Sequence, residues 1–286
     1  MLKRWNLVKI SQLKSNRLKL IAIKYRKYLK SEKKKKNRLK RSENGNIRSV
    51  LKIMSWNKGK NDISKMGNIE EIKELIKDKK PDILFINELN LKDTDDIGNM
   101  NIINYNFEHD LLYFSNGIAR LGAWIKSYLV YSRIKHLEGN EEAVIALKIG
   151  YPNKKRFTLI GQYRQWSAIY KNKKFRKFEY TEQNERLKVF TEKISKLIES
   201  NNDIIILGDM NIDWKTFYMK EENKDSYQKN FNNMISSLKE DFIDKGLRQI
   251  MLDNTRYDTT LDHIYINNFN KLKRVYSDKT LVLIIV

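Results

Sequence analysis

Polar side chains follow several apolar, strand-like runs of the sequence at the point where each run ends or begins. They are Asn57 after KIMSW, Glu88 after DILFIN, Asp209 and Asn211 after DIIILG, Asp262 before HIYI, and Asp278 before the final apolar run. Side chains at strand ends lie at the rim of a sheet, where binding and catalytic sites are usually built. Carboxylate and amide oxygens suit a hard cation such as Mg²⁺ or Mn²⁺. The pattern therefore predicts a divalent-metal site at one rim.

Each of these residues also has a plainer interpretation. Asn and Asp are common turn formers and helix caps, and for any single position that explanation is preferred. The chain has three histidines and no cysteine, so a thiolate metal site and a disulfide framework are both excluded. The recurrence of the same oxygen-bearing residue types at successive strand ends is what favours the metal site.

The elements that must carry these residues are expected from the hydrophobic pattern. Apolar runs predict strands over 50–56, 82–87, 123–131, 142–149, 156–163, 203–208, 261–266 and 280–286. Helical spacing predicts helices over 68–80, 180–200 and 226–247. Pro81 cannot continue the first helix, and Gly246 favours the end of the last one. Several strands follow one another without an intervening helix, which favours a mixed sheet or two packed sheets flanked by helices.

Charge divides the chain into two parts. The whole sequence carries 57 Lys and Arg against 35 Asp and Glu, and this net charge of +22 favours nucleic acid or an anionic membrane face as a partner. By Arg41 the chain has used 17 of the basic residues and only one acid, Glu32. We therefore expect residues 1–49 to form a basic, partly helical or disordered extension, and residues 50–286 to form the folded domain.

The extension leaves three interpretations open besides a solvated tail. It could be a nucleic-acid arm, which is favoured, a nuclear address, or an acid-poor transit peptide. No apolar run is long enough to span a membrane, and the N-terminus lacks the apolar core of a secretory signal. Together with the absence of cysteine, these features predict an intracellular protein, with the nucleus as one destination.

A second basic stretch, RQWSAIYKNKKFRKFEY over 164–180, interleaves Arg and Lys with aromatic residues. Proteins that bind single-stranded nucleic acid stack bases on aromatic rings and hold the backbone with cations. Arg164, Trp166 and Arg176 are therefore the candidate nucleic-acid contacts. The plain alternative is a solvated surface loop.

Five motifs occur in a fixed order along the chain: IMSWNKGK, PDILFINELN, LIGQYRQW, IIILGDMNID and TTLDHIYIN. In content, order and spacing they resemble the endonuclease/exonuclease/phosphatase family, which includes DNase I-like enzymes and abasic-site endonucleases. The match covers roughly residues 50–286. The resemblance implies a four-layer α/β sandwich, in which two packed mixed β-sheets lie between outer helices. It also implies metal-dependent hydrolysis of a phosphodiester, with DNA as the partner and Mg²⁺ or Mn²⁺ as the cofactor.

Within that family, YRQW, GDMNIDW and TRYDTTLDHIYIN are most similar to the endonuclease domains of non-LTR retroelements. In those elements the domain normally precedes a reverse transcriptase, so a reverse transcriptase domain is expected in a parent element. The abrupt apolar end at Val286 suits a domain truncated from a longer reading frame.

The resemblance implies a role for each matching residue. Glu88 matches the metal-binding glutamate, and Asn57 lies beside it in the same site. Asp209 matches the residue that positions or deprotonates the attacking water. Asn211 matches a neighbour that helps to orient that group and the phosphate. Tyr163 matches the tyrosine placed against the scissile phosphate.

The last motif departs from the family. Asp262 matches the acid that normally holds a histidine, and Asp278 belongs to the family's final SDH, but Lys279 stands where that histidine is expected. Lysine has a reference pKa of about 10.4, against about 6.5 for histidine, so it is a poor proton shuttle near neutral pH. His263 is expected to point away from the site, because neighbours on a strand alternate. Either the enzyme is impaired or the last segment is misaligned, and the plain alternative for SDK is a polar turn before an edge strand.

Three functions stay open. The first is a Mg²⁺-dependent DNA endonuclease of retroelement origin. The second is a catalytically inactive nucleic-acid-binding remnant. The third is a phosphatase that acts on a phospholipid or a nucleotide, because one fold hosts many activities. The positive charge and the YRQW motif favour the first.

Overall fold

The computed structural model describes residues 50–57, 66–111, 117–139, 142–151, 154–165, 167–169, 175–177, 179–200, 203–219, 231–251, 253–255, 258–268, 270, 272–278 and 281–285. The chain divides into two units, Met1–Val50 and Leu51–Val286. The predicted basic extension, residues 1–49, lies outside the described residues and stays a prediction. The second unit carries every described helix and strand.

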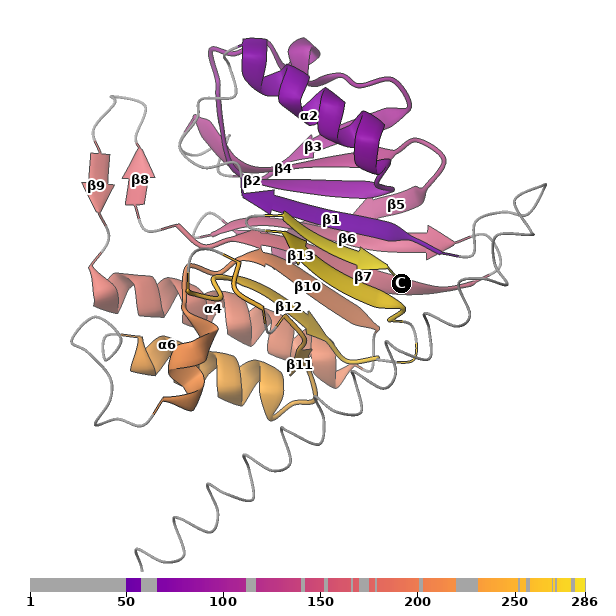
Figure 1. Ribbon diagram of the computed structural model, residues 1–286. Helices are drawn as coiled ribbons and strands as arrows, with labels where there is room; N and C mark the ends of the chain where they lie inside the picture. The colour runs from indigo at the N-terminus through magenta and orange to yellow at the C-terminus, as the bar shows by residue number, and fades with distance from the viewer. Residues whose placement is uncertain are drawn as a thin grey trace, which may run out of the picture. The chain divides into compact units, whose positions relative to one another are not determined.

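Two six-stranded mixed sheets form the centre of this unit (Figure 1). The first has the order β13-β14-β1-β2-β4-β3, with bounds Arg274–Asp278, Leu281–Ile285, Lys52–Asn57, Ile83–Lys92, Ile118–Lys126 and Tyr105–His109. The second has the order β11-β12-β10-β7-β6-β5, with bounds Arg248–Gln249, Asp262–Ile266, Ile204–Asp209, Lys154–Tyr163, Ala143–Tyr151 and Val130–Arg133. A separate hairpin pairs β8, Ser167–Ile169, with β9, Phe175–Lys177.

Helices cover the outer face of each sheet. Helix α2, Met66–Lys79, packs on the first sheet, where Ile69, Ile72 and Ile76 join its outer core. Helices α4, Tyr180–Glu199, and α6, Asn232–Leu238, pack on the second. A π-helical turn, η5, continues α6 over Lys239–Ile243. Short 3₁₀ turns, η1 to η3, span Ile97–Met100, Lys135–Leu137 and Trp214–Tyr218.

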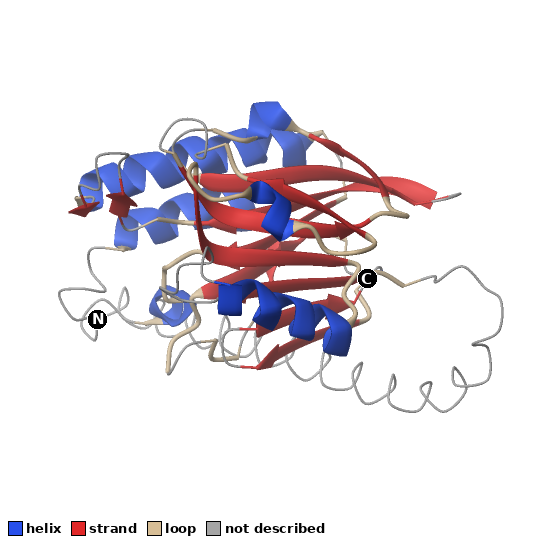
Figure 2. Ribbon diagram, turned by 90° about the horizontal axis from the view of Figure 1, so that it is seen from above, coloured by secondary structure: helices blue, strands red, loops and turns tan. Residues whose placement is uncertain are grey.

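The layers therefore follow the order helix, sheet, sheet, helix, as Figures 1 and 2 show. Each apolar side chain that is fully buried in these layers contributes about 1.5–3 kcal/mol. The predicted four-layer α/β sandwich is confirmed. None of the described helices is long and apolar enough to cross a membrane.

Each sheet contains one parallel pair of strands. In the first sheet β1 and β2 are parallel, in register from Ile53↔Ile83 to Asn57↔Asn87. In the second sheet β7 and β10 are parallel and end at Tyr163↔Asp209. The other ladders of the two sheets are antiparallel. The β7–β10 pair therefore presents two carboxyl ends side by side, whereas β1 ends opposite Asn87 and β2 continues to Lys92.

Two glycines permit close approaches near these ends. A Cβ atom on Gly161 of β7 would lie 2.3 Å from the ring of Phe85 on β2, so this glycine lets the two sheets pack tightly. Gly208 of β10 has φ +143, and a Cβ there would lie 1.8 Å from the carbonyl oxygen of Gln162. No other residue type suits that combination of backbone angle and contact.

One predicted strand, and one alternative interpretation of the final run, are wrong. The apolar run over 123–131 is not one strand, because β4 ends at Lys126 and β5 begins at Val130 in the other sheet. The intervening turn contains a buried leucine, Leu129, so it does not interrupt the hydrophobic pattern. The final apolar run is also not an edge strand, because β14 lies between β13 and β1. The hydrophobic pattern does not predict the short strand β13, because its last residues also suit a polar turn.

Candidate active site

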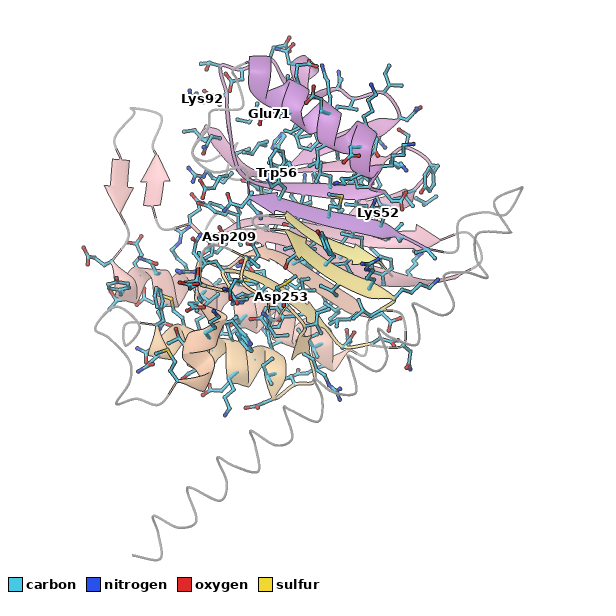
Figure 3. All side chains as sticks on the ribbon, viewed as in Figure 1. Lys52, Trp56, Glu71, Lys92, Asp209 and Asp253 are labelled. Atoms are coloured by element: carbon cyan, nitrogen blue, oxygen red, sulfur yellow. The ribbon has the colours of Figure 1, made fainter. Side chains whose placement is uncertain are left out.

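The ends of the two parallel pairs meet at the side chain of Asn57. Its Nδ2 donates a hydrogen bond to Oδ2 of Asp209, at 2.5 Å, and a longer one to Oε1 of Glu88, at 3.4 Å. Asn57 and Glu88 belong to the first sheet and Asp209 to the second, and all three side chains are buried. Figure 3 shows Asp209 near the end of β1 that carries Trp56. The structure thus brings together residues from three separate motifs.

Unusual backbone conformations direct two of the site residues. Glu88 has φ +57 and Asn211 has φ +50, both in the left-handed region. Glu88 lies in a bulge of β2, where the pairing with β4 passes from Asn87↔Leu121 to Leu91↔Ala119. A bulge re-aims a side chain, and left-handed non-glycine residues cost of order 1–3 kcal/mol each and cluster at functional sites.

The surroundings of the Asp209 carboxyl group disfavour its ionised form. Burial, reinforced by the nearby negative charge of Glu88, raises its pKa to about 7. Hydrogen bonds oppose this rise, because the backbone amide of Asn211 donates to Oδ1 at 2.8 Å and the amide of Asn57 donates to Oδ2. A carboxylate with a pKa near neutrality is suited to accept a proton from water.

Tyr163 ends β7 directly beside Asp209. Its side chain is buried, and this burial raises the pKa of its hydroxyl well above the ordinary value. The hydroxyl oxygen accepts a hydrogen bond from Nη2 of Arg120, at 3.1 Å. Tyr163 is therefore a protonated phenol that can donate to an anion, and it is not a base.

The structure describes Asp262 completely but only the backbone of Asp278. Asp262 opens β12, is buried, and is the pairing partner of Asp209. Asp278 is the last residue of β13. It pairs with Leu281 of β14, which in turn pairs with Trp56 of β1, so the backbone of Asp278 lies at the same end of the first sheet as Asn57. The side chain of Asp278 and the whole of Lys279 lie outside the described residues, and their predicted roles stay predictions.

His263 points away from the site, as strand alternation predicts. Its Nε2 lies 2.8 Å from the carbonyl oxygen of Ile212, and its Nδ1 lies 2.9 Å from the hydroxyl of Tyr265. Burial lowers its pKa to about 4. This neutral ring is part of the packing between β12 and Trp214, and it cannot replace a catalytic histidine.

Arg164 does not lie where its predicted role requires. Its side chain is fully buried, so it cannot contact a phosphate on the surface. Its guanidinium instead donates to the carbonyl oxygens of Met210 and Asn211 and to Oε1 of Gln183. In return, Nδ2 of Asn211 donates to the carbonyl oxygen of Arg164, at 2.7 Å. The arginine thus holds the segment that follows Asp209.

The other predicted nucleic-acid contacts are not placed. Trp166 lies outside the described part of the chain, and only the backbone of Arg176 is described. Arg176 belongs to β9 and pairs with Ala168 of β8. Figure 1 shows this hairpin standing apart from the two large sheets. Contact of Trp166 and Arg176 with nucleic acid stays a prediction.

The donor set is suited to a hard divalent cation. Glu88 and Asp209 present carboxylate oxygens, and Asn57 directs its amide nitrogen at both of them. The repulsion between the two carboxylates is of the kind that a cation relieves. Within the described ranges, no group of three or more His, Cys, Asp or Glu side chains could enclose a metal ion.

One residue of this site was missed in the sequence. Arg120 lies inside the apolar run of β4 and not at a strand end, so the pattern of polar rim residues does not include it. The available signal was the charge itself, because an arginine within a buried strand is unusual unless it is paired or functional. Its neighbour in space, the buried Asp110, was missed because it follows β3, a strand that the hydrophobic pattern did not predict.

Comparisons with known proteins agree with this fold. A model of the Endonuclease/Exonuclease/phosphatase family matches residues 54–278. The endonuclease domain of TRAS1, a telomere-specific non-LTR retrotransposon, is 14% identical, with 83% of this chain and 98% of that chain covered and a TM-score of 0.56. The AP endonuclease LMAP from Leishmania major is also 14% identical, with 83% and 87% covered and a TM-score of 0.61.

A third similar structure is a variant of the 3′ phosphatase NExo from Neisseria bound to a product DNA hairpin. It is 15% identical, with 82% of this chain and 98% of that chain covered and a TM-score of 0.51. No curated protein matches the chain significantly. Identities this low establish a shared fold only, whereas the family model spans most of the sequence. On that match, the chain belongs to the endonuclease/exonuclease/phosphatase family.

Proposed function

We propose that the protein is a Mg²⁺-dependent endonuclease that nicks DNA. The observation that carries the proposal is the convergence of Asn57 and Glu88 from one sheet with Asp209 from the other. This arrangement gives a buried carboxyl group with a pKa near 7 next to a second carboxylate, Glu88, that can bind a cation. Phosphodiester hydrolysis requires both features, because the substrate is anionic and water is a poor nucleophile.

Each residue has a role that its contacts support. Asp209 orients the attacking water and takes its proton. The hydroxyl of Tyr163 donates to a phosphate oxygen, and Asn211 helps to orient Asp209 through its backbone amide. Asp262 is the buried pairing partner of Asp209, so it lies beside the proposed general base. A divalent cation held by Glu88, with Asn57 beside it, would neutralise charge on the phosphate and on the departing oxygen.

DNA is the proposed substrate because of charge and motif. The net charge of +22 favours a polyanion over a small phosphorylated molecule. The YRQW and GDMNIDW motifs are the basis for proposing a retroelement origin. Lys279, where the resembling motif has histidine, leads us to expect slow nicking, since a lysine cannot transfer protons at neutral pH.

The test is a nicking assay on supercoiled plasmid with the purified chain. We expect nicking with Mg²⁺, none with EDTA, and a rate lower by at least about 10²-fold for Asp209→Asn, because a general base contributes 10²–10⁴-fold. Asp253→Asn is the matched control, since Asp253 is exposed and its change from acid to amide is the same. Equal nicking by Asp209→Asn and the parent would show that the site assignment is wrong.

Two further outcomes separate the alternatives. We expect Lys279→His to raise the nicking rate at least about tenfold, as a proton-transfer group is restored. If neither the parent nor Lys279→His nicks, while both bind DNA, the chain is an inactive nucleic-acid-binding remnant. If the parent instead releases phosphate from a phospholipid or a nucleotide and leaves plasmid intact, the protein is a phosphatase.

A further inference from the structure

Arg120 occupies a position in β4 that faces the bulge of β2. Between the pairs Asn87↔Leu121 and Leu91↔Ala119, three residues of β2 lie opposite Arg120 alone, and Glu88 is the first of the three. The backbone here is fixed from the other side. Oδ2 of the buried Asp110 accepts hydrogen bonds from the backbone amides of Arg120, at 2.7 Å, and Leu121, at 2.6 Å. Two consecutive amides bound to one carboxylate oxygen hold this point of the strand firmly.

The guanidinium of Arg120 crosses from the first sheet to the second. Its Nη2 donates to the hydroxyl of Tyr163, and its central carbon lies 5.2 Å from the centre of the Tyr163 ring. The half-buried arginine therefore places a fixed positive charge beside the residue that ends β7. Tyr163 is in turn the pairing partner of Asp209, so the charge lies within the candidate active site.

The direction of this hydrogen bond determines what Tyr163 can do. Because the tyrosine oxygen accepts from Arg120, its own hydrogen points to another acceptor. A phosphate oxygen bound between Tyr163 and Arg120 would receive that hydrogen and at least one guanidinium N–H. Paired donors of this kind suit phosphate, and arginine is the residue that most often provides them.

Arg120 differs from the structural arginines of the same protein. Arg133 is bound to the carboxylates of Glu108 and Glu138, and the buried Arg164 donates to three oxygen acceptors. Within the described residues, the guanidinium of Arg120 has one hydrogen-bond acceptor, a neutral hydroxyl, and its buried Nε has none. A half-buried cation without an anionic partner is energetically costly unless a ligand supplies the missing anion.

We propose that Arg120 is a catalytic residue that binds a nonbridging oxygen of the scissile phosphate together with Tyr163. The inference rests on the proposed function, because it names a group that contacts the same phosphodiester. Its role is to hold the phosphate and to balance the negative charge that develops in the transition state. Preorganised donors of this type are each worth about 10²–10³-fold in rate.

Nicking by Arg120→Gln, Arg120→Lys and the control Arg248→Gln tests the proposal. Arg248 is exposed and lies beside Ile266, at the opposite end of β12 from Asp262, so its replacement changes the charge equally away from the site. We expect Arg120→Gln to lower the rate about 10²–10³-fold, Arg120→Lys to give an intermediate rate, and Arg248→Gln to change it less than about twofold, as is usual for surface substitutions. Free guanidinium ion at millimolar concentration should partly restore Arg120→Gln only, which a purely structural role would not allow.

Binding to a short DNA duplex in EDTA provides a second test, which does not depend on catalytic activity. We expect Arg120→Gln to bind the duplex less tightly than Arg248→Gln. The slope of log affinity against log salt concentration should also fall, by the amount that corresponds to about one phosphate contact. If the parent does not nick but this difference is present, the proposed endonuclease function fails while the phosphate contact stands. If the Arg120 variants bind and nick as the parent does, or if guanidinium restores nothing to a folded Arg120→Gln, the inference about Arg120 is wrong.

Discussion

Arg164 is fully buried, and its guanidinium binds the segment that carries the proposed general base. A planar guanidinium can serve three acceptors at once, which a single ammonium cannot do in the same geometry. The reciprocal bond from Asn211 to the carbonyl oxygen of Arg164 closes the arrangement. The segment that follows Asp209 is therefore held by a fully buried residue.

Replacement of Arg164 by lysine should lower both stability and activity. We expect Arg164→Lys to lower the free energy of unfolding by about 2–4 kcal/mol, because buried carbonyl oxygens of Met210 and Asn211 lose donors. Denaturant unfolding and plasmid nicking measure the two effects. Arg133→Lys is the control, since Arg133 is a largely buried and paired arginine too, but it binds Glu108 and Glu138, away from the site. Equal loss of nicking in both variants would contradict a positioning role for Arg164.

Single residues were predictable where a motif contains them. Asn57, Glu88 and Asp209 stand out because each directly follows an apolar run, and the structure brings them together. Arg164 was misplaced because it belongs to a basic and aromatic stretch, whereas its burial depends on α4 and on the segment after β10. Arg120 was missed because only the packing of one sheet on the other brings it to Tyr163.

At the scale of elements, the parallel pairs explain why the site lies where it does. Each parallel pairing ends at two polar residues on neighbouring strands, at Asn57↔Asn87 for β1 with β2 and at Tyr163↔Asp209 for β7 with β10. The sheets must approach closely for Asn57 to reach Asp209, and Gly161 is the residue that allows this approach over Phe85. The geometry of the site is therefore coupled to the thickness of the layer between the sheets.

A methyl group at Gly161 should disturb that layer. We expect Gly161→Ala to lower the free energy of unfolding by about 1–3 kcal/mol, as for overpacked cores, and to reduce nicking as the sheets separate. Gly150→Ala is the control, because a Cβ there meets its nearest atom, the carbonyl oxygen of Val130, at an ordinary 3.4 Å. Denaturant unfolding of both variants measures the difference. Restored stability in the double variant Gly161→Ala, Phe85→Leu would support the steric cause, and unchanged stability of Gly161→Ala would refute it.

The strands and helices with strong apolar periodicity, such as α4 and β10, were predictable. The change of sheet between β4 and β5 was not, since hydrophobic patterning records burial and not which sheet receives a strand. The bulge in β2 also left no signal. Its three-against-one pairing depends on β4, which follows in the chain only after two further segments.

At the scale of the whole molecule, stability depends on buried ionisable groups with opposing effects. Burial lowers the pKa of His263 to about 4, whereas burial raises the pKa of Asp209 and of Glu142 to about 7. His263 therefore contributes stability that is present above its unfolded pKa of about 6.5 and is lost as pH falls toward 4. Asp209 and Glu142 change stability in the opposite direction with pH. Their ionisation above the unfolded pKa is less favourable in the folded state, so they lower stability as pH rises.

The contribution of His263 can be isolated by comparing the parent with His263→Gln. We expect the stability of the parent, relative to the variant, to fall by up to about 3 kcal/mol between pH 6.5 and pH 4, as the unfolded parent takes up a proton that the folded one does not. The measurement is the free energy of unfolding by denaturant at a series of pH values. A difference that stays constant over this range would mean that His263 keeps an ordinary pKa in the folded protein.

The pairing of β14 with β1 joins the last described strand to the first. During synthesis, which delivers the N-terminal strands first, β1 can pair with β2 long before β14 has left the ribosome. Until then, one side of β1 is an unpaired edge of an apolar strand, and such edges recruit other chains. The nascent protein should therefore need a chaperone most in the interval before β14 emerges, and the rim that carries Asn57 should become fixed only once that strand has docked.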